Sequence, residues 1–281
     1  MTWEPTGFAP VTDQVLRVQR AGVNLYVVLG DQGVTLIDAG LPGMWRLLLR
    51  ALRSVGAGVE DIKAVALTHG HFDHVGLCDR LQSDHGVPVY AHPDDVRLVR
   101  HPYRYDHEAP RWPYPFRHPG ALRIQAGMVA AGALWVSGVT ARPSVADGLP
   151  LDVPGAPVPV ASPGHTDGHC GFLLEKAGVL FTGDALVTLD PYSGRRGPRM
   201  VARAATADVA RNTRSLDSLA ATDAAIVLPG HGARGLTLDL GHADSSTALG
   251  KRESKGWQGR TIRMISGGGR WTCMSRRRAR R

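Results

Sequence analysis

The sequence predicts an α/β domain in which two β-sheets pack face to face and helices cover their outer faces. Three observations lead to this prediction. Short apolar segments separated by glycine-containing turns open the chain, segments with helical spacing follow them, and the same order recurs in the second half. Elements that are apolar on one side must bury that side, so repeated sets of strands and helices favour two sheets with outer helices. A chain of 281 residues is long enough for one such domain, and we expect a single one.

The first half of the chain begins with a predicted meander of three strands. Alternating or continuous apolar residues at 15–18, 24–29 and 34–37 are separated by turns that contain glycine. Leucines at helical spacing predict a helix at 44–55, which ends before Gly56. This half continues with a strand at 64–67, a helix at 73–85, a strand at 87–90 and a short helix at 94–99.

The second half opens with a segment of unusual composition. Residues 101–119 contain five prolines and several aromatic residues with few aliphatic ones, which predicts a loop or lid within an insertion at about 100–145. We expect a return to helix at 120–135, before a proline-rich stretch at 143–159. The remaining predicted elements are strands at 158–161, 171–175 and 179–182, a helix at 202–220 and a strand at 224–228.

The net charge of +8 is concentrated at the end of the chain. Residues 251–281 hold eleven of the 33 basic residues and one of the 25 acidic ones, so they carry +10 while residues 1–250 carry −2. This tail has no apolar period, which predicts a basic, disordered segment after a single domain at 1–250. A neutral to acidic domain disfavours nucleic acid as a partner, because long nucleic acids need a basic groove.

Other features of composition concern the compartment. No apolar run approaches the roughly 20 residues that a membrane-spanning helix needs. The first residues, MTWEPTGFAP, lack the pattern of a secretory leader. We therefore expect a cytoplasmic protein without membrane contact. The cysteines Cys78, Cys170 and Cys273 form no CxxC pair, which indicates neither a disulfide framework nor a thiolate zinc site.

A cluster of four potential metal ligands follows the predicted strand at 64–67. The motif HxHxDH contains His69, His71, Asp73 and His74. Imidazole and carboxylate groups are typical ligands of zinc, iron and manganese. His69 and His71 project to the same side of an extended chain, because side chains alternate with period two, so both can reach one ion. Asp73 and His74 come where the chain turns into a helix, so they can face a second ion.

Three further ligand candidates each follow a predicted strand. They are His165 in SPGHTDGH, Asp184 in LFTGDAL and His231 in LPGHG. Singly they indicate little, but their joint occurrence in this order after HxHxDH resembles the metallo-β-lactamase-fold hydrolase superfamily over roughly residues 13–235. The resemblance, to glyoxalase II-like and lactonase-like members in particular, implies an αββα sandwich of two mixed sheets with metals at one edge between them.

The resemblance also implies roles within this site. The ligands of a first divalent ion would be His69, His71 and His165. Those of a second ion would be Asp73, His74 and His231, with Asp184 bridging the two. Asp38 in LIDAG matches a position that fixes the HxHxDH loop, and His169 matches a supporting histidine beside the ligands. Zinc is the expected metal, with iron and manganese as alternatives.

These features together predict a hydrolase in which hydroxide held by two metals cleaves a small-molecule ester, thioester or lactone. Asp73 would receive or relay the proton, and Tyr192 would donate to the substrate carbonyl, as a tyrosine does in some lactonase relatives. The insertion would cap the acyl group, although an aromatic loop that only adds stability is an equal alternative. Its candidate walls are Tyr103, Tyr105, Trp112, Tyr114 and Phe116.

Other functions stay open from the sequence alone. An enzyme similar to persulfide dioxygenases would use one iron, bound by His69, His71 or neighbouring ligands, His165 and Asp184. A phosphodiesterase or nuclease is a further alternative, whereas β-lactamase activity is disfavoured because zinc β-lactamases generally replace the bridging aspartate. A binding protein with a vestigial site is a weak alternative, since none of the seven positions is missing. Homodimers are common for such folds, but the sequence holds no interface signal.

Overall fold

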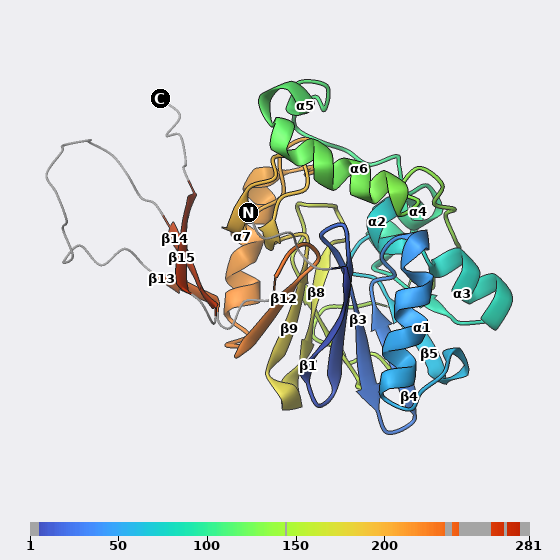
Figure 1. Cartoon of the computed structure of the whole chain (residues 1–281). Coiled ribbons are helices and arrows are strands. Elements are labelled where there is room, and N and C mark those ends of the chain that lie inside the picture. The colour runs from blue at the N-terminus through green and yellow to red at the C-terminus, as the bar shows by residue number, and fades with distance from the viewer. Residues whose placement is uncertain (1–5, 144, 234–237, 242–259, 267–268, 276–281) are drawn as a thin grey trace, which may run out of the picture.

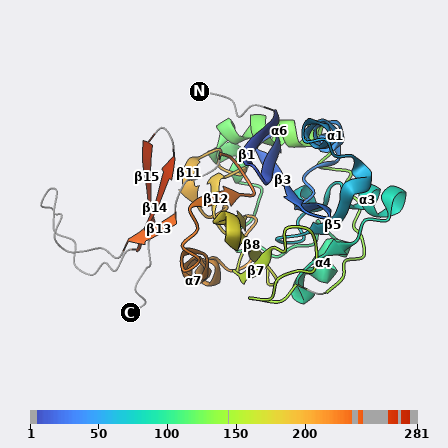
Figure 2. The ribbon, with the colours of Figure 1, turned by 90° about the horizontal axis from the view of Figure 1, so that it is seen from below.

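The chain folds into a four-layer sandwich of helix, sheet, sheet and helix (Figure 1). The computed structural model describes residues 6–143, 145–233, 238–241, 260–266 and 269–275. Helices α1 (Trp45–Ser54) and α3 (Cys78–His85) lie outside one sheet, and α7 (Val209–Ala220) lies outside the other (Figure 1, Figure 2). This architecture confirms the predicted αββα fold, in which each sheet buries one face against its partner and the other face against helices.

The first sheet has the strand order β1–β2–β3–β4–β5–β6. Its strands are β1 (Gly7–Thr12), β2 (Val15–Arg20), β3 (Val23–Gly30), β4 (Gly33–Ile37), β5 (Ile62–Ala66) and β6 (Val89–Tyr90). Neighbours from β1 to β4 are antiparallel, whereas β4, β5 and β6 are parallel. Five of these strands match predicted ones. Strand β1 is not predicted, because a partly exposed edge strand that contains Pro10 shows no apolar alternation.

The second sheet has the strand order β12–β9–β8–β7. Its strands are β7 (Val158–Ala161), β8 (Cys170–Leu174), β9 (Val179–Gly183) and β12 (Ile226–Pro229). Strands β7, β8 and β9 form an antiparallel meander, and β12 pairs parallel to β9. All four are predicted from the sequence. A separate hairpin is formed by β10 (Val187–Leu189) and β11 (Arg196–Arg199). The sequence does not predict this hairpin, because both strands are very short.

Among the described residues the buried apolar side chains form four clusters, three of which lie between the layers of the sandwich, and strand alternation decides which of these three a strand residue joins. On β3, Leu25 and Val27 belong to the core between the first sheet and its helices. Tyr26 and Val28 point the other way, into the core between the two sheets, where the Tyr26 ring lies 5.1 Å from that of Phe181. A third core lies between the second sheet and α7. Period-two alternation in a sheet buried on both faces therefore produces the four layers.

The predicted helix at 73–85 is two helices in the structure, α2 (Phe72–Val75) and α3. The break occurs because Gly76 donates its backbone N–H to Gly40 O at 2.8 Å, and Leu77 donates to Ala39 O at 3.2 Å. A Cβ at position 76 would lie 2.3 Å from Gly40 O, so only glycine allows this approach. The loop after β4 is thereby bonded to the HxHxDH segment.

The predicted helix at 202–220 begins only at Val209, as α7. Its N-cap is Asp208, whose side chain accepts from Arg211 N–H at 2.7 Å. Upstream of the cap, Ala207 N–H donates to His165 O at 3.1 Å. The chain therefore leaves the helical path because its backbone donors bond to the loop that carries His165.

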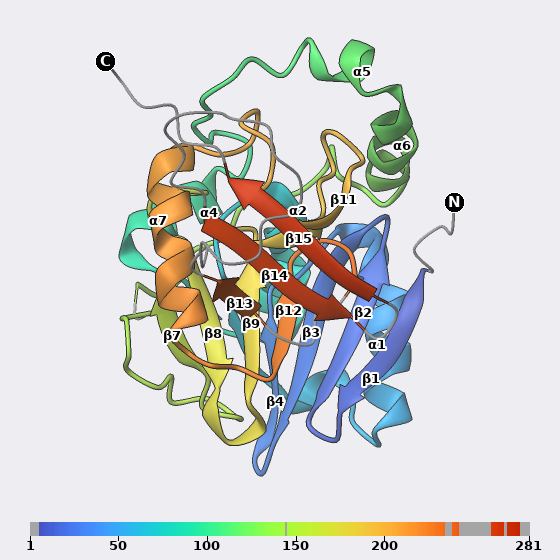
Figure 3. The ribbon, with the colours of Figure 1, turned by 90° about the vertical axis from the view of Figure 1, so that its left-hand side faces the viewer.

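Four short α-helices complete the main body within the described residues. They are α2, α4 (Val96–Arg100), α5 (Tyr114–Arg117) and α6 (Leu122–Ala130). Helices α5 and α6 belong to the predicted insertion and lie above the strand ends (Figure 1, Figure 3). Residues 101–113 form neither helix nor strand, as their composition predicts. Within the described ranges, every helix is too short or too polar to span a bilayer.

Part of the basic tail lies within the described residues. Strands β13 (Leu238–Gly241), β14 (Arg260–Ser266) and β15 (Gly269–Ser275) form an antiparallel sheet. The prediction of disorder at 251–281 does not hold for β14 and β15; in β14 the sequence alternates polar residues with Ile262 and Met264. The rest of that predicted segment lies outside the described residues.

Candidate metal centre

The candidate ligands lie at one edge of the sandwich, where strands of both sheets end. In the first sheet, Asp38 follows β4, and residues 68–74 follow β5. In the second sheet the residues that follow β7, β9 and β12 include His165, Asp184 and His231. A backbone hydrogen bond of 2.8 Å from Asn24 N–H in β3 to Gly230 O joins the two sheets at this edge. Loops that are far apart in sequence therefore meet.

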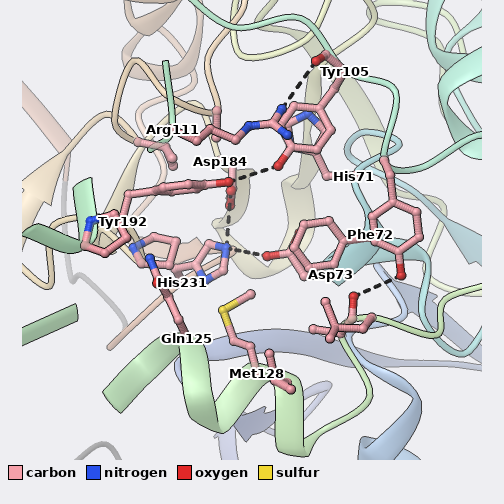
Figure 4. Close-up of a pocket in the computed structure, with 18 residues that line it drawn as sticks. His71, Phe72, Asp73, Tyr105, Arg111, Gln125, Met128, Asp184, Tyr192 and His231 are labelled. Carbon is pink, nitrogen blue, oxygen red and sulfur yellow. Dashed lines mark hydrogen bonds and ion pairs between the residues drawn. The ribbon is translucent and has the colours of Figure 1, made fainter. Parts of the chain in front are cut away.

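The structure brings all seven predicted ligands into one buried cluster. Asp184 is at its centre, with Oδ1 3.4 Å from His74 Nε2 and Oδ2 3.3 Å from His231 Nε2. His231 Nε2 also lies 3.2 Å from Asp73 Oδ2 (Figure 4). Ligand atoms lie within 4.8 Å of one another in three groups, which are His69, His71 and His165; His69, His74 and Asp184; and Asp73, His74 and His231.

The cluster fits divalent metal ions, as its unpaired polar atoms show. Five buried ligand atoms have no hydrogen-bond partner, namely Nε2 of His69, His71, His74 and His231 and Oδ1 of Asp184. Buried polar atoms without partners are costly and rare, so five that converge on one region need a ligand. Imidazole nitrogens and carboxylate oxygens suit zinc, iron or manganese. Gly230 leaves room there, because a Cβ at that position would lie 2.3 Å from Asp184 Oδ1.

The protonation of four of the ligands, three histidines and Asp184, also suits metal binding. Burial, with the neighbouring imidazoles, holds the pKa values of His69 and His71 well below the usual value of histidine. Burial likewise lowers the pKa of His165 to about 4. Burial opposes the ionisation of Asp184, but His231 and His74 outweigh it and hold the pKa of its carboxyl well below its usual range. The other two histidines differ, because burial is outweighed by neighbouring carboxylates: Asp38 and Asp184 raise the pKa of His74 well above its usual value, and Asp184 and Asp73 raise the pKa of His231 to about 10. Neutral imidazoles and an ionised carboxylate are the forms that bind cations, so His74 and His231 release a proton when a cation binds.

Asp38 orients the HxHxDH segment from the end of β4. Its Oδ2 lies 2.9 Å from His74 Nδ1, and its Oδ1 accepts from Thr68 N–H at 2.8 Å. The ring of His74 therefore donates through Nδ1 and keeps Nε2 free for the cluster. Asp38 has a φ of 59°, in the left-handed region that non-glycine residues seldom adopt. Such backbone strain is tolerated where hydrogen bonds on several sides fix the residue.

His169 performs a similar task for Asp184. Its Nε2 accepts from the backbone N–H groups of Asp184 at 3.1 Å and Ala185 at 3.3 Å. Its Nδ1 lies 2.9 Å from Ser162 Oγ and donates to it, because Nε2 is already an acceptor. Burial lowers the pKa of His169 to about 3, which keeps the ring neutral in this role. His169 thus supports the loop that carries Asp184.

Comparison with known proteins identifies the family. A model of the metallo-beta-lactamase superfamily matches residues 18–231, which is most of the chain. The chain belongs to the metallo-β-lactamase superfamily. The matched residues include every candidate ligand and both supporting residues, Asp38 and His169.

Relatives within this superfamily include probable metallo-hydrolases. YflN of Bacillus subtilis, a probable metallo-hydrolase, is 33% identical over 168 residues, which cover 55% of this chain and 56% of YflN. The chain therefore spans little more than half the length of that relative. YqjP of the same organism, another probable metallo-hydrolase, is 27% identical over 229 residues, which cover 75% of this chain and 67% of YqjP.

Solved structures show the same fold. The metallo-beta-lactamase family protein TTHA1429 from Thermus thermophilus is 30% identical with a TM-score of 0.53, covering 75% of this chain and 69% of that one. TTHA1623, solved in a di-iron-bound form, is 26% identical with a TM-score of 0.56, covering 78% and 92%. BJP-1, a subclass B3 metallo-beta-lactamase of Bradyrhizobium japonicum, is 21% identical with a TM-score of 0.57, covering 81% and 78%, a likeness of fold alone.

One supporting residue of this superfamily member is not found by sequence reasoning. Asp95, just before α4, is 2% exposed and accepts three hydrogen bonds. Its Oδ2 accepts from Gly70 N–H at 2.9 Å and from Thr166 Oγ1 at 2.8 Å, and its Oδ1 accepts from Gly168 N–H at 2.9 Å. Asp95 therefore joins the loop of His69 and His71 to the loop of His165. In the sequence, Asp95 is recognisable only as a residue at the start of the predicted helix at 94–99, so its contacts with the two loops are not predicted.

Replacing Asp95 with asparagine is expected to loosen this junction. An amide offers one acceptor oxygen, so at least one backbone N–H loses its partner, at a cost of about 2 kcal/mol. For a domain of this size the melting temperature would fall by about 4–8 °C. Metal affinity, measured by competition with a chromophoric chelator, would fall as well. The control is Asp94→Asn, because Asp94 is the adjacent residue and its own side chain is 61% exposed. Equal effects of the two substitutions on melting temperature and metal affinity would contradict the role of Asp95.

A cavity of about 310 Å³ opens beside the cluster. Its floor is formed by His71, Asp73, Asp184 and His231, and its walls are mostly apolar. Met128 and Gln125 extend toward it from α6, opposite Tyr105 and Arg111 (Figure 4). The apolar wall residues are Phe72, Tyr103, Pro115, Met128, Val129, Ala133, Leu134, Pro191, Val201 and Ala205.

The predicted aromatic walls are present only in part. Tyr103 and Tyr105 line the cavity, as does Tyr192. Trp112 and Phe116 do not, because they are 73% and 81% exposed on the outer side of the insertion. Tyr114 is not among the lining residues either, although its neighbour Pro115 in α5 is. Side chains of α6 and of the loop after it form this part of the cavity wall instead. The apolar pattern of that helix is typical of any packed helix, so the sequence does not indicate that it lines a cavity.

Proposed function

We propose that this chain is a metal-dependent hydrolase that cleaves small-molecule esters, thioesters or lactones with an apolar acyl group. One observation carries the proposal, namely an apolar cavity whose floor is the candidate metal cluster and whose wall includes three tyrosines. Ligand sites of this kind are concave and mostly apolar, with a few polar groups that orient the ligand. The apolar lining also favours a small-molecule substrate over a polyanion such as nucleic acid.

The seven ligands would hold two divalent cations in the arrangement that the sequence predicts. His69, His71 and His165 form one group of donors, and Asp73, His74 and His231 form another. Asp184 has one oxygen near His74 and the other near His231, so it is placed to bridge them. Bound divalent cations, zinc first among them, supply Lewis acidity and lower the pKa of a coordinated water from 15.7 to about 7.

Two tyrosines are placed to orient the substrate carbonyl. Tyr192 Oη lies 2.9 Å from Tyr105 Oη, and both residues line the cavity. Burial raises the pKa of each phenol, so both stay protonated at neutral pH. One hydroxyl donates to the other, which leaves one O–H free for the substrate oxygen. We assign that free donor to Tyr192, since Arg111 lies 4.1 Å over the Tyr105 ring and favours Tyr105 as the donor within the pair.

The remaining cavity residues position the acyl group and exclude water. Phe72, Met128 and Val129 present apolar surface to it. Each buried methylene of a substrate contributes about 0.8 kcal/mol to binding. The Asp73 carboxylate reaches the cavity floor, where it can accept the proton released as water adds to the carbonyl. The substrate and its leaving group would thus lie between the apolar wall and the metal ligands.

Replacing Tyr192 with phenylalanine is expected to lower kcat/KM about tenfold to a hundredfold, mostly through kcat, because a donor to the developing oxyanion is lost. Tyr105→Phe should have a smaller effect, about tenfold, since it removes the partner that orients Tyr192. Steady-state kinetics on an aryl ester would measure both. The control is Tyr90→Phe, whose hydroxyl contacts Arg142 outside the cavity. A Tyr192→Phe enzyme with unchanged kinetics would contradict the assignment.

A persulfide dioxygenase with iron is the second candidate. Its support is TTHA1623, a 26% identical structure in a di-iron-bound form. A dioxygenase with one iron would leave the group of Asp73, His74 and His231 without a purpose, although the ligand atoms of this group also lie within 4.8 Å of one another. The hydrolase therefore agrees better with the full set of ligands.

The deciding experiment is a substrate panel on protein purified without chelator, with elemental analysis of the same sample. Lactones, thioesters, aryl esters and phosphodiesters would be compared with a glutathione persulfide assayed by oxygen consumption. The proposal expects turnover of at least one carbonyl substrate, with preference for apolar over charged acyl groups. Oxygen consumption with stoichiometric iron and no hydrolysis would replace it with the second candidate.

A further inference from the structure

Exposed apolar side chains gather in the insertion above the cavity. Among the described residues, seven of the nine large apolar side chains that are exposed lie between residues 103 and 135. Six of them, here called the insertion surface, are Trp112, Phe116, Leu122, Val129, Leu134 and Trp135. Soluble proteins usually scatter exposed apolar residues singly, and their concentration in one segment marks an interaction surface.

The insertion surface continues into the cavity. Val129 and Leu134 belong to it and also line the cavity wall. Trp135, 71% exposed, follows Leu134 directly, while Tyr103 Oη accepts from Val136 N–H at 2.9 Å and so fixes this loop to the insertion. Helices α5 and α6, which carry much of the surface, lie at the top of the sandwich (Figure 1, Figure 3). A partner covering this surface would therefore also cover the entrance to the cavity.

The charge of the same segment selects the kind of partner. Residues 112–135, which span the insertion surface, contain Arg117 and Arg123 and no acidic residue, so they carry +2, whereas the rest of residues 1–250 carries −4. A second copy of the chain would bring two basic surfaces together, which like-charge repulsion disfavours. Segments that lie in the interfacial region of anionic membranes typically combine exposed tryptophan and phenylalanine with arginine.

We propose that the insertion surface docks on the surface of an anionic lipid bilayer. Trp112, Phe116 and Trp135 enter the headgroup region, and the exposed Arg117 and Arg123 attract the lipid phosphates. Such docking is peripheral and needs no spanning helix. It departs from the expectation of no membrane contact, which rested on the lack of a spanning segment and of a leader pattern in the sequence. If the proposed hydrolase function holds, the cavity receives acyl substrates that partition into the bilayer, and this second part rests on that function.

Co-sedimentation of the full chain with lipid vesicles tests the docking. We expect binding to vesicles of phosphatidylcholine mixed with phosphatidylglycerol, and weaker binding to phosphatidylcholine alone. Phe116→Ser combined with Trp135→Ser should lower the partition coefficient about tenfold, since two aromatic side chains lose their burial in the interface. Leu149→Ser is the matched control, because Leu149 is 64% exposed and lies outside the insertion. The basic tail is present in every variant, so its attraction to anionic lipid is held constant.

Three results would overturn the proposal. One is the absence of vesicle binding by the parent chain, and another is equal binding by the double variant and the Leu149→Ser control. The third is a double variant that changes a dimer into a monomer, as seen by light scattering, while vesicle binding is unchanged; the surface would then join two copies. Hydrolysis of a soluble short-chain ester is measured in parallel and should persist in the double variant, since Phe116 and Trp135 do not line the cavity. A parent chain without hydrolysis that still binds vesicles would contradict the proposed function and leave the docking intact.

Discussion

Replacing Asp184 with alanine is expected to lower hydrolysis by a factor of about a thousand or more, with loss of bound metal. The reason is its central position, with one oxygen 3.4 Å from His74 Nε2 and the other 3.3 Å from His231 Nε2 and 3.6 Å from His165 Nε2. The change therefore removes the carboxylate that is proposed to bridge the two groups of donors. Elemental analysis and kcat/KM on the best substrate of the panel would measure the effect.

The matched control for this change is Asp31→Ala. Asp31 is exposed in the turn between β3 and β4, away from the strand ends that carry the cluster. The Asp31→Ala protein should keep the metal content and the activity of the parent protein. Circular dichroism of both variants shows whether the fold persists, so that a loss of metal is not confused with unfolding. An Asp184→Ala protein with full metal content and full turnover would contradict the proposed site.

Removal of metal by a chelator is expected to abolish hydrolysis and to destabilise the fold. A ligand present at a thousand times its Kd stabilises the folded state by about 4 kcal/mol, so the melting temperature should fall by roughly 10 °C. The physical cause is the set of five buried polar atoms without hydrogen bonds, which the cations would otherwise satisfy. Differential scanning calorimetry before and after chelation measures this change.

Return of activity on adding zinc, manganese or iron separately would identify which metals support turnover. The same chelation applied to Asp184→Ala serves as the internal control, since a protein that holds little metal should show little change in melting temperature. Unchanged activity of the parent after verified metal removal would overturn the proposed mechanism, whatever the substrate.

The fold is largely predictable because its signals are local. Strands such as β3 and β9 are continuous apolar runs, and α1 carries leucines at helical spacing, so their burial pattern can be recognised along the chain. The wrong predictions have a different origin. The breaks before α3 and α7 arise from hydrogen bonds to distant loops at Gly40 and His165, which no pattern around those positions reveals.

In the candidate site, too, the residues in local motifs are predicted from the sequence, whereas those that depend on distant contacts are not. The cluster residues stand in recognisable motifs at strand ends, and the structure brings together all seven, with Asp38 and His169 beside them. Asp95 is not predicted because its three donors come from residues 70, 166 and 168, two of which lie more than 70 positions away. Composition predicts Trp112 and Phe116 as cavity walls, but the fold leaves both side chains exposed to solvent.

The sequence by itself determined the layered fold and the chemistry of the site, because apolar period and the choice of histidine and aspartate are properties of residue order. Tertiary structure alone decided what surrounds that chemistry: the Asp95 junction, the pairing of Tyr105 with Tyr192, and the helix α6 that walls the cavity. These depend on contacts between segments far apart in the chain. Such contacts are selected by packing in three dimensions, so they leave no periodic trace in the sequence.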